Sequence, residues 1–439
     1  MGLSKKTKLI VSLALTISLT SVLTIGCNNG VSQSNNNKTQ EASNDSTLIY
    51  TQGIEQTTIY GKVKGSKENN EKTLLWQGIP YAKAPISNLR WKAPEDPEIW
   101  NNVFDATTPG NVGIQLSGSD IIGSEDCLNL DIYRPNTDET NLPVLLFIHG
   151  GNNQTGTSSE IDARKLAVNA NCIVVSINYR LGALGFNSLP ALKTGDINED
   201  SGNYTLLDIA KSLDWINENI EAFGGNPNNI TASGFSAGGR DIMAMLISPI
   251  FEGKFQKAIA FSGGMTISDP EESAQIIAKA IAPLVIEDNV KETEEDAYNW
   301  LLTDDTEVKY YLYSLFLTDT VTGFGASYPE AFNNEGAKDL SNKFTKYISN
   351  FLWNDNPNGE DLVEWNSWTS SSDGPTQLLL DADLNKAIIT ISHERTSYES
   401  ILNEIENDHS ITDEDKNTIV KEVLNGRWFS SRLDSYFNN

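Results

Sequence analysis

The stretch Ile230-Thr231-Ala232-Ser233-Gly234-Phe235-Ser236-Ala237-Gly238-Gly239 decides the fold, because a β-rich run passes there into a helical one. Residues 230–235 predict a strand and residues 237–247 predict a helix. Glycines on both sides of Ser236 allow a sharp strand-to-helix turn that would expose the hydroxyl at the end of the strand. The first N–H groups of the helix favour an oxygen that gains negative charge. The pattern predicts a nucleophile elbow centred on Ser236, the alternative being an ordinary glycine-rich turn.

A second glycine-rich turn, His149-Gly150-Gly151-Asn152, directly follows the apolar run 144–148. A turn at the end of a strand beside the elbow is where an enzyme of this kind places the remaining oxyanion donors. We therefore expect the backbone N–H groups of Gly151, Asn152 and Ala237 to converge on the substrate oxygen as an oxyanion hole. His149 belongs to this turn, so we interpret it as a residue that orders the loop rather than as a general base.

Around the two turns, short β-rich runs alternate with helical stretches between Leu48 and Ile267. This alternation is typical of a mixed or parallel sheet covered by helices. A helix is expected over 206–220, where its apolar residues form one stripe, and Asn219 with Gly224-Gly225 should end it. The expected strands are Leu128–Tyr133, Val144–Ile148, Cys172–Asn178, Ile230–Phe235 and Lys257–Phe261.

After Ile267 the sequence changes to acidic helices and Asn/Asp-rich loops. One helix is expected to open at Glu292, Glu294, Glu295 and Asp296, and another to run from Asp413 to Leu424. Only Lys386 to Ile391 is a candidate for a further strand buried on both faces.

The 439 residues include 32 Lys and Arg against 59 Asp and Glu, which gives a formal net charge of −27. Such an acidic protein lacks the basic face that nucleic acid or an anionic lipid surface requires, so neither is an expected partner. Its three cysteines form no disulfide framework and no zinc or redox spacing, and we expect no structural metal.

The N-terminus predicts export. Residues 1–26 combine three lysines with an apolar run, as a secretory signal peptide does. The run ends in Ile25-Gly26-Cys27, which resembles the lipobox of bacterial lipoproteins, so Cys27 is the expected site of lipidation. The polar stretch 27–47 is expected to be a disordered tether, followed by one domain over 48–439. The protein is therefore predicted to face outward from the cell membrane, attached to it only by this lipid anchor. After ordinary cleavage it would instead be secreted.

Several short stretches around the two turns match a known family in their order along the chain. They are Gln77 to Ala82, Leu89 to Pro94, Ser124 to Leu130, Asn178 to Gly182, Gly202 to Tyr204 and Asn219 to Pro227. On these stretches the chain resembles the type-B carboxylesterases, relatives of the cholinesterases with the α/β-hydrolase fold. The resemblance implies a mostly parallel central sheet flanked by helices, and hydrolysis of small acyl or aryl esters with no cofactor. It also implies two buried structural ion pairs, Arg90 with Glu125 and Arg180 with Asp208.

The resemblance fails downstream of the nucleophile, where the family carries a catalytic acid and a histidine. Similarity resumes at Phe324-Gly325-Ala326-Ser327-Tyr328-Pro329, where Phe324 occupies the histidine position. The interval before it is short and has no match to the acid-bearing turn, so we interpret 268–323 as a divergent, shortened segment. His393 is a weak candidate base; His393 and His409 otherwise read as exposed histidines at helix ends. The formal candidates for the acid are Asp305, Asp319 and Glu330, and none is favoured.

Smaller departures lie near the elbow. The residue before the nucleophile is Phe235, where the family usually has Glu, and Asn152 stands for the third oxyanion glycine. The family's upstream cysteine would fall at Gly113. Cys127 is therefore expected to be a small buried apolar residue.

Three hypotheses follow from the sequence. The first is a working carboxylic ester hydrolase that uses Ser236, the oxyanion hole and an unplaced base. The second is a non-catalytic, surface-anchored binding protein that keeps the esterase shell, as the cholinesterase-like adhesion proteins do. The third is an internally deleted remnant that folds poorly because part of its core is exposed.

Overall fold

The computed structural model describes residues 48–68, 70–117, 120–264, 268–315, 335–367, 374–375, 377–382, 385–393, 398–409 and 412–419. The predicted signal peptide, Cys27 and the rest of the 27–47 tether lie outside these ranges. So do Phe324, Asp319 and Glu330.

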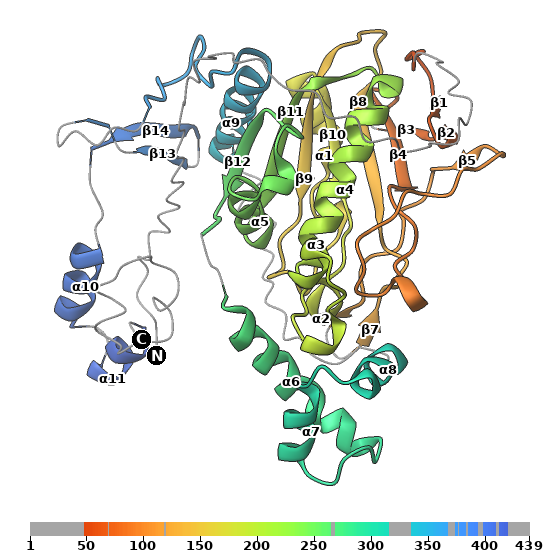
Figure 1. Ribbon diagram of the computed structural model, residues 1–439. Coiled ribbons are helices and arrows are strands. Elements are labelled where there is room, and N and C mark those ends of the chain that lie inside the picture. The colour runs from red at the N-terminus through yellow and green to blue at the C-terminus, as the bar shows by residue number, and fades with distance from the viewer. Residues whose placement is uncertain are drawn as a thin grey trace, which may run out of the picture.

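A seven-stranded mixed sheet lies at the centre of the molecule, in the order β12-β11-β9-β10-β8-β4-β3 (Figure 1). The four strands from β12 to β10 are parallel to one another, and the other three are antiparallel to their neighbours. All five strands expected from the sequence are in this sheet; Lys257–Phe261 has the expected ends, and the other four have shifted ends. Their bounds and those of the other two are β3 Ser66–Glu68, β4 Thr73–Pro80, β8 Asn129–Pro135, β9 Leu142–Ile148, β10 Ile173–Ile177, β11 Gly225–Phe235 and β12 Lys257–Phe261.

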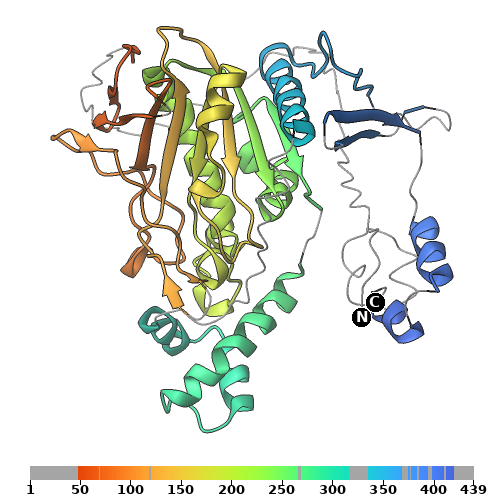
Figure 2. The same ribbon diagram turned by 180° about the vertical axis from the view of Figure 1, so that it is seen from behind.

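Helices cover both faces of the sheet (Figures 1 and 2). Helices α4 (Tyr204–Asn219) and α5 (Ala237–Met245) pack on one face through residues such as Leu213, Ile216 and Ile242. Helices α1 (Ala163–Ala170) and α9 (Glu335–Asn354) pack on the other, where Ala167 and Leu352 share a buried cluster. Every residue of β9 and β10 is therefore buried, which explains why their sequences are apolar apart from Ser176.

Helix α4 ends as the sequence predicts. It stops at Asn219, a short 3₁₀ turn follows over Ile220–Phe223, and Gly224 adopts a φ of 78°. That left-handed conformation favours glycine and turns the chain back into β11.

Smaller elements frame the sheet. A three-stranded sheet has the order β1-β2-β5, and β6 pairs with β7. The bounds are β1 Glu55–Thr58, β2 Gly61–Lys64, β5 Phe104–Asp105, β6 Gln115–Ser117, β7 Asp120–Ile122, α2 Gly182–Gly185 and α3 Ile197–Asp200. Single 3₁₀ turns lie at Ser87–Leu89, Ser158–Glu160, Pro190–Leu192 and Pro249–Phe251.

The helices α6 (Pro270–Glu287), α7 (Glu294–Leu301) and α8 (Thr306–Ser314) follow β12 and extend from one end of the sheet (Figure 1). Thr293 caps α7, so Glu294, Glu295 and Asp296 lie in its first turn as predicted and Glu292 lies before it. These helices share a buried cluster with Trp91, Leu189 and Tyr204 of the sheet-bearing body. The shared cluster joins them to that body.

The C-terminal elements differ in part from expectation. A strand does occur near 386–391, but within the described ranges β14 (Ala387–Ser392) pairs only with β13 (Gln377–Ala382), and it mixes buried, half-buried and exposed residues. The expectation of a doubly buried strand is wrong there, because the hairpin contacts α9 from outside the central sheet. Helix α10 spans Tyr398–Asn407, and α11 begins at Asp413 as predicted and is described to Thr418.

No helix within the described ranges combines the length and the apolar character needed to cross a membrane.

Candidate active site

Ser236 lies at the junction of β11 and α5 with φ 54° and ψ −112°. A non-glycine residue with positive φ is uncommon and strained, so the surrounding structure must hold it. Its N–H donates to the Phe261 carbonyl of β12 at 2.8 Å, and its own carbonyl accepts from the Arg240 N–H at 3.0 Å. The neighbouring strand and the first turn of α5 thus fix the serine at the end of the sheet.

Two glycines of the motif are required by close backbone approach. A Cβ atom on Gly238 would lie 2.2 Å from the Ile148 carbonyl oxygen at the end of β9. A Cβ atom on Gly234 would lie 2.2 Å from the Gly238 carbonyl oxygen. Neither position has room for a side chain, and this is why the strand can turn so tightly into the helix.

The second turn packs directly against the elbow. A Cβ atom on Gly150 would come within 3.3 Å of the Ser236 Cβ atom. The next three residues, Gly151, Asn152 and Asn153, all have positive φ angles, of 89°, 59° and 57°. We call residues 150–153 the oxyanion turn, after the role that the sequence predicts for it.

The oxyanion turn offers free donors. Within the described part of the chain, the N–H groups of Gly151 and Asn152 donate no hydrogen bond. Ala237 is the first residue of α5, so its N–H has no acceptor inside the helix. The Gly150 N–H, by contrast, donates to the Glu160 carboxylate at 2.8 Å. The free donors belong to Gly151, Asn152 and Ala237, and their role as an oxyanion hole stays a prediction.

His149 lies behind the turn and is 1% exposed. Its ring stacks on Tyr179 with 4.2 Å between centroids, and its Nδ1 atom lies 2.9 Å from the Gly150 carbonyl oxygen. Burial lowers the pKa of His149 to about 4, so the imidazole is neutral at physiological pH. These contacts suit a residue that orders the turn.

A general base does not accompany the nucleophile among the described residues. The Ser236 hydroxyl forms no hydrogen bond there, and all three histidines of the chain fall within the described ranges. His393 follows β14 and His409 follows α10, and both are exposed. These elements lie to one side of the sheet beyond α9, whereas α5 lies against the sheet (Figures 1 and 2).

Asp305, one formal candidate for the catalytic acid, caps a helix instead. Its side chain caps α8 by accepting the Glu307 N–H at 2.9 Å. The structure therefore gives Asp305 a local role at a helix start and no imidazole to orient.

The two ion pairs implied by the resemblance are both present. The Arg180 guanidinium donates to the two Asp208 oxygens at 2.8 and 2.6 Å, and the two side chains are 2% and 0% exposed. Arg90 pairs with Glu125 through two hydrogen bonds. Arg90 also donates to the carbonyls of Leu312, Tyr313 and Leu315, so it holds the end of α8 as well.

The described cysteines and acidic residues form no further reactive or metal-binding group. Cys127 and Cys172 are free and buried, and burial raises the pKa of the Cys172 thiol to about 12. Both behave as small apolar residues in the core. No cluster of three or more His, Cys, Asp or Glu side chains with a metal-holding arrangement occurs among the residues that the structure describes.

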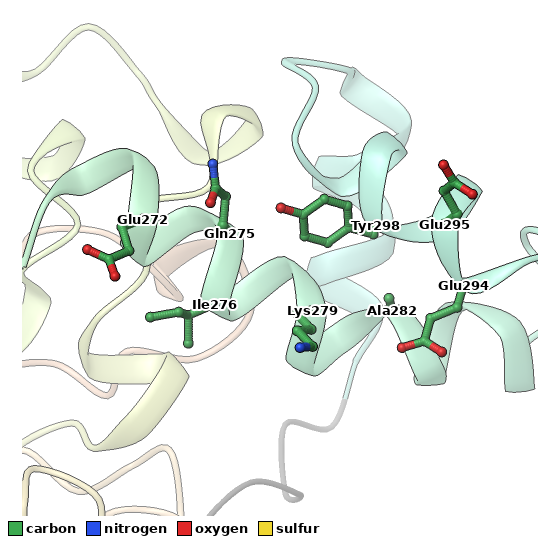
Figure 3. Close-up of a pocket in the computed structure, with 8 residues that line it drawn as sticks. All are labelled: Glu272, Gln275, Ile276, Lys279, Ala282, Glu294, Glu295 and Tyr298. Atoms are coloured by element: carbon green, nitrogen blue, oxygen red, sulfur yellow. The ribbon is translucent and has the colours of Figure 1, made fainter. Parts of the chain in front are cut away.

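An open cavity of about 660 Å³ lies between α6 and α7 (Figure 3). In the view of Figure 3, Tyr298 points from α7 towards α6, and glutamates lie towards both ends of the cavity. Ser236 and the oxyanion turn do not line it. The lining residues are Glu272, Gln275, Ile276, Lys279, Ala282, Glu294, Glu295 and Tyr298.

Sequence reasoning missed the residues that hold the oxyanion turn in place, and the part that Asn153 plays within it. Glu160 accepts the Gly150 N–H, and the Tyr179 hydroxyl donates to the His149 carbonyl at 2.8 Å. Asn153 donates to Asp241 at 2.9 Å. The signal for Asp241 was an acidic residue five positions after the nucleophile, on a helix face that must pack inward. Nothing local in the sequence connects Glu160 with the turn.

Comparison with known proteins places the chain in a family. The model described as "Carboxylesterase family" matches residues 52–307. Para-nitrobenzyl esterase of Bacillus subtilis (strain 168) is 45% identical over 242 residues, which are 52% of this chain and 48% of that protein. Acylcarnitine hydrolase of Rattus norvegicus is 39% identical over 250 residues, 52% of this chain and 44% of that protein. A solved PNB esterase structure, 40% identical, covers 60% of this chain and 54% of its own, with a TM-score of 0.49.

The chain spans about half the length of the curated relatives it matches. The matched region holds the mixed sheet, the flanking helices α1, α4 and α5, the elbow and the oxyanion turn. The chain belongs to the carboxylesterase family and has the α/β-hydrolase fold.

Proposed function

We propose that the protein hydrolyses small carboxylic esters through Ser236. The observation that carries this proposal is the strained conformation of Ser236 directly beside the oxyanion turn, whose free N–H groups have no other described partner. Structure that holds a strained serine next to unused donors suits acyl transfer. Family membership supports the same class of reaction.

The reaction needs two displacements. The Ser236 hydroxyl loses its proton and attacks the acyl carbon, and the N–H groups of Gly151, Asn152 and Ala237 stabilise the oxyanion that forms. The alcohol then leaves with a proton, and water attacks the acyl-enzyme to release the acid and regenerate the serine. No cofactor takes part in this sequence of steps.

The base is the distinctive feature of the proposal. Because no histidine contacts Ser236 in the described structure, we assign the removal of the serine proton to hydroxide from the solvent. An oxyanion hole without its complete triad accelerates such reactions only about 10³–10⁴-fold over water. We therefore expect a slow esterase.

The test is hydrolysis of p-nitrophenyl acetate by the purified chain beside its Ser236→Ala variant. The wild type should exceed the variant, and the logarithm of the Ser236-dependent kcat/KM should rise by about one per pH unit from pH 6 to 9, because hydroxide is the base. A plateau with a midpoint near 6.5 would instead reveal a histidine base. His393→Ala would then be the next variant.

The absence of a base beside Ser236 in the described structure also favours a second candidate function, binding without catalysis. A protein that keeps the esterase shell without turnover would bind a partner or ligand, and Phe324 at the family's histidine position fits that hypothesis. Equal rates for the wild type and Ser236→Ala, from protein that unfolds cooperatively, would favour this binding role over the hydrolase. The place of action, outside the cell through a lipid on Cys27, is part of the proposal for either function.

A further inference from the structure

The oxyanion turn is held from α5 by two consecutive side chains. The Arg240 Nη2 atom donates to the Asn152 Oδ1 atom at 2.5 Å. The Asn153 Nδ2 atom donates to the Asp241 Oδ1 atom at 2.9 Å. The two residues so held are the two non-glycine residues of the turn with positive φ, at 59° and 57°. Each strained residue of the turn therefore has its own contact with the nucleophile helix.

Asn153 also links the turn to the chain behind it. Its carbonyl accepts the Gly182 N–H at 2.7 Å, and its side-chain oxygen lies 3.4 Å from the Tyr179 hydroxyl. Displacing Asn153 would therefore disturb the support of the whole turn, His149 included.

The carboxyl group of Asp241 is buried and only partly hydrogen-bonded. Its side chain is buried, with 5% of the residue exposed, and its Oδ2 atom has no hydrogen-bond partner among the described residues. A buried carboxylate with one donor is costly, whereas a neutral carboxylic acid is tolerated.

We propose that Arg240 and Asp241 are positioning residues that clamp the oxyanion turn to the nucleophile helix, with Asp241 acting as a neutral acid. Arg240 fixes Asn152, which carries one of the oxyanion donors, and Asp241 fixes Asn153 behind it. This clamp rests on the proposed function in one respect, that the turn supplies the oxyanion donors.

The surroundings of Asp241 agree with a neutral form. Burial raises the pKa of Asp241 to about 7, against lowering effects of the Asn153 hydrogen bond and of Arg240. The charged or titratable groups that face it are Arg240 on its own helix and Tyr179 after β10, with His149 and Glu160 beyond Tyr179. Above about pH 7 the Asp241 carboxylate would be more stable in contact with water, and the oxyanion turn must open for water to reach it.

The pH dependence of stability gives a test that does not need turnover. The ordinary pKa of an aspartate is 3.8, so between about pH 4 and pH 7 the unfolded chain releases a proton that the folded chain retains. Wild type should therefore lose stability relative to Asp241→Asn as pH rises through this window, and the difference should be constant above it. Parallel melting temperatures of the two proteins from pH 4 to 8 would overturn the neutral acid.

Hydrogen exchange tests the clamp itself, in the full chain. The amides of Gln154 and Thr155 bond to the Gly151 carbonyl and report closure of the turn. In Asp241→Ala they should exchange about tenfold faster than in wild type, the equivalent of one buried hydrogen bond. Asp241→Asn keeps an acceptor for Asn153 and should restore slow exchange. Met245→Ala, buried on the same helix, is the control that weakens packing without touching the turn.

Unchanged exchange at Gln154 and Thr155 in Asp241→Ala, or the same acceleration in Met245→Ala, would overturn the clamp. If the protein turns over ester, Asp241→Ala should lower kcat with little change in KM, because the oxyanion forms after the substrate binds. If Ser236→Ala shows that there is no turnover, exchange and melting still decide on the clamp, so the failure of either proposal is distinguishable.

Discussion

Arg180 and Asp208 show what a single buried pair contributes. Asp208 on α4 accepts two hydrogen bonds from the Arg180 guanidinium and a third from its backbone N–H at 3.1 Å. Both charges are removed from water, so each depends on the other for compensation. Replacing one partner leaves the other buried without its counter-charge.

Asp208→Asn should destabilise the protein by about 3–5 kcal/mol, because the Arg180 charge would remain buried without a carboxylate. The change keeps the size of the side chain, so packing is hardly altered. Equilibrium unfolding in urea, followed by fluorescence, measures the loss.

The matched control is the exposed pair of Lys83 with Glu95, whose nitrogen and oxygen lie 3.0 Å apart. Lys83→Ala should leave the urea midpoint unchanged, since water and salt screen such pairs. If Asp208→Asn and Lys83→Ala shifted the urea midpoint equally, burial would not be what makes the Arg180–Asp208 pair important.

Single residues also show where sequence reasoning succeeds and where it stops. Ser236 and its flanking glycines were predictable because a tight strand-to-helix turn needs small residues next to one another in the sequence. Asp241 and Glu160 were not, because their roles depend on contact with a turn that lies far away in the sequence. Tertiary proximity, which no local pattern encodes, decides these roles.

At the scale of elements, β9, β11 and α5 form one unit around the elbow. The first turn of α5 lies against the end of β9, where Gly238 meets the Ile148 carbonyl. The strands were predictable because a parallel strand covered on both faces must be apolar throughout. Strand β14 was misjudged because a short apolar run is also compatible with one face of an outer hairpin.

Gly238→Ala tests this packing. The added Cβ atom would lie 2.2 Å from the Ile148 oxygen, so the helix must shift away from β9. The expected cost is about 1–3 kcal/mol of stability, together with loss of any Ser236-dependent hydrolysis. Thermal unfolding and the ester assay measure the two effects.

Gly264→Ala is the control for that substitution, since a Cβ atom there meets nothing within 4 Å among the described residues and its φ lies outside the left-handed region. Its melting temperature should match that of the wild type. A stable, normally folded Gly238→Ala protein would show that the first turn of α5 is less tightly packed than the structure indicates.

At the scale of the molecule, the described sheet ends at β12, and no strand in the described ranges pairs with its outer side. Helix α9 packs against this end of the sheet. Phe344 contacts Phe261 of β12 edge to face, and the Lys257 ammonium pairs with Asp355 at 2.6 Å and donates to the Leu352 carbonyl at 2.7 Å. A segment beyond the family match thus covers part of the strand that would otherwise be most exposed.

This covering favours a folded member of the family over a damaged remnant, and unfolding tests the choice. The cluster that joins α6–α8 to Trp91 and Tyr204, together with Arg90 at the end of α8, couples the later helices to the sheet. We therefore expect one cooperative unfolding transition, with coincident curves from far-ultraviolet circular dichroism and from tryptophan fluorescence. Trp76, Trp91 and Trp215 are almost completely buried and report the core directly. Broad curves that separate between the two probes would indicate that α6–α8 or α9 unfolds on its own, and would favour the remnant hypothesis over both the esterase and the binding protein.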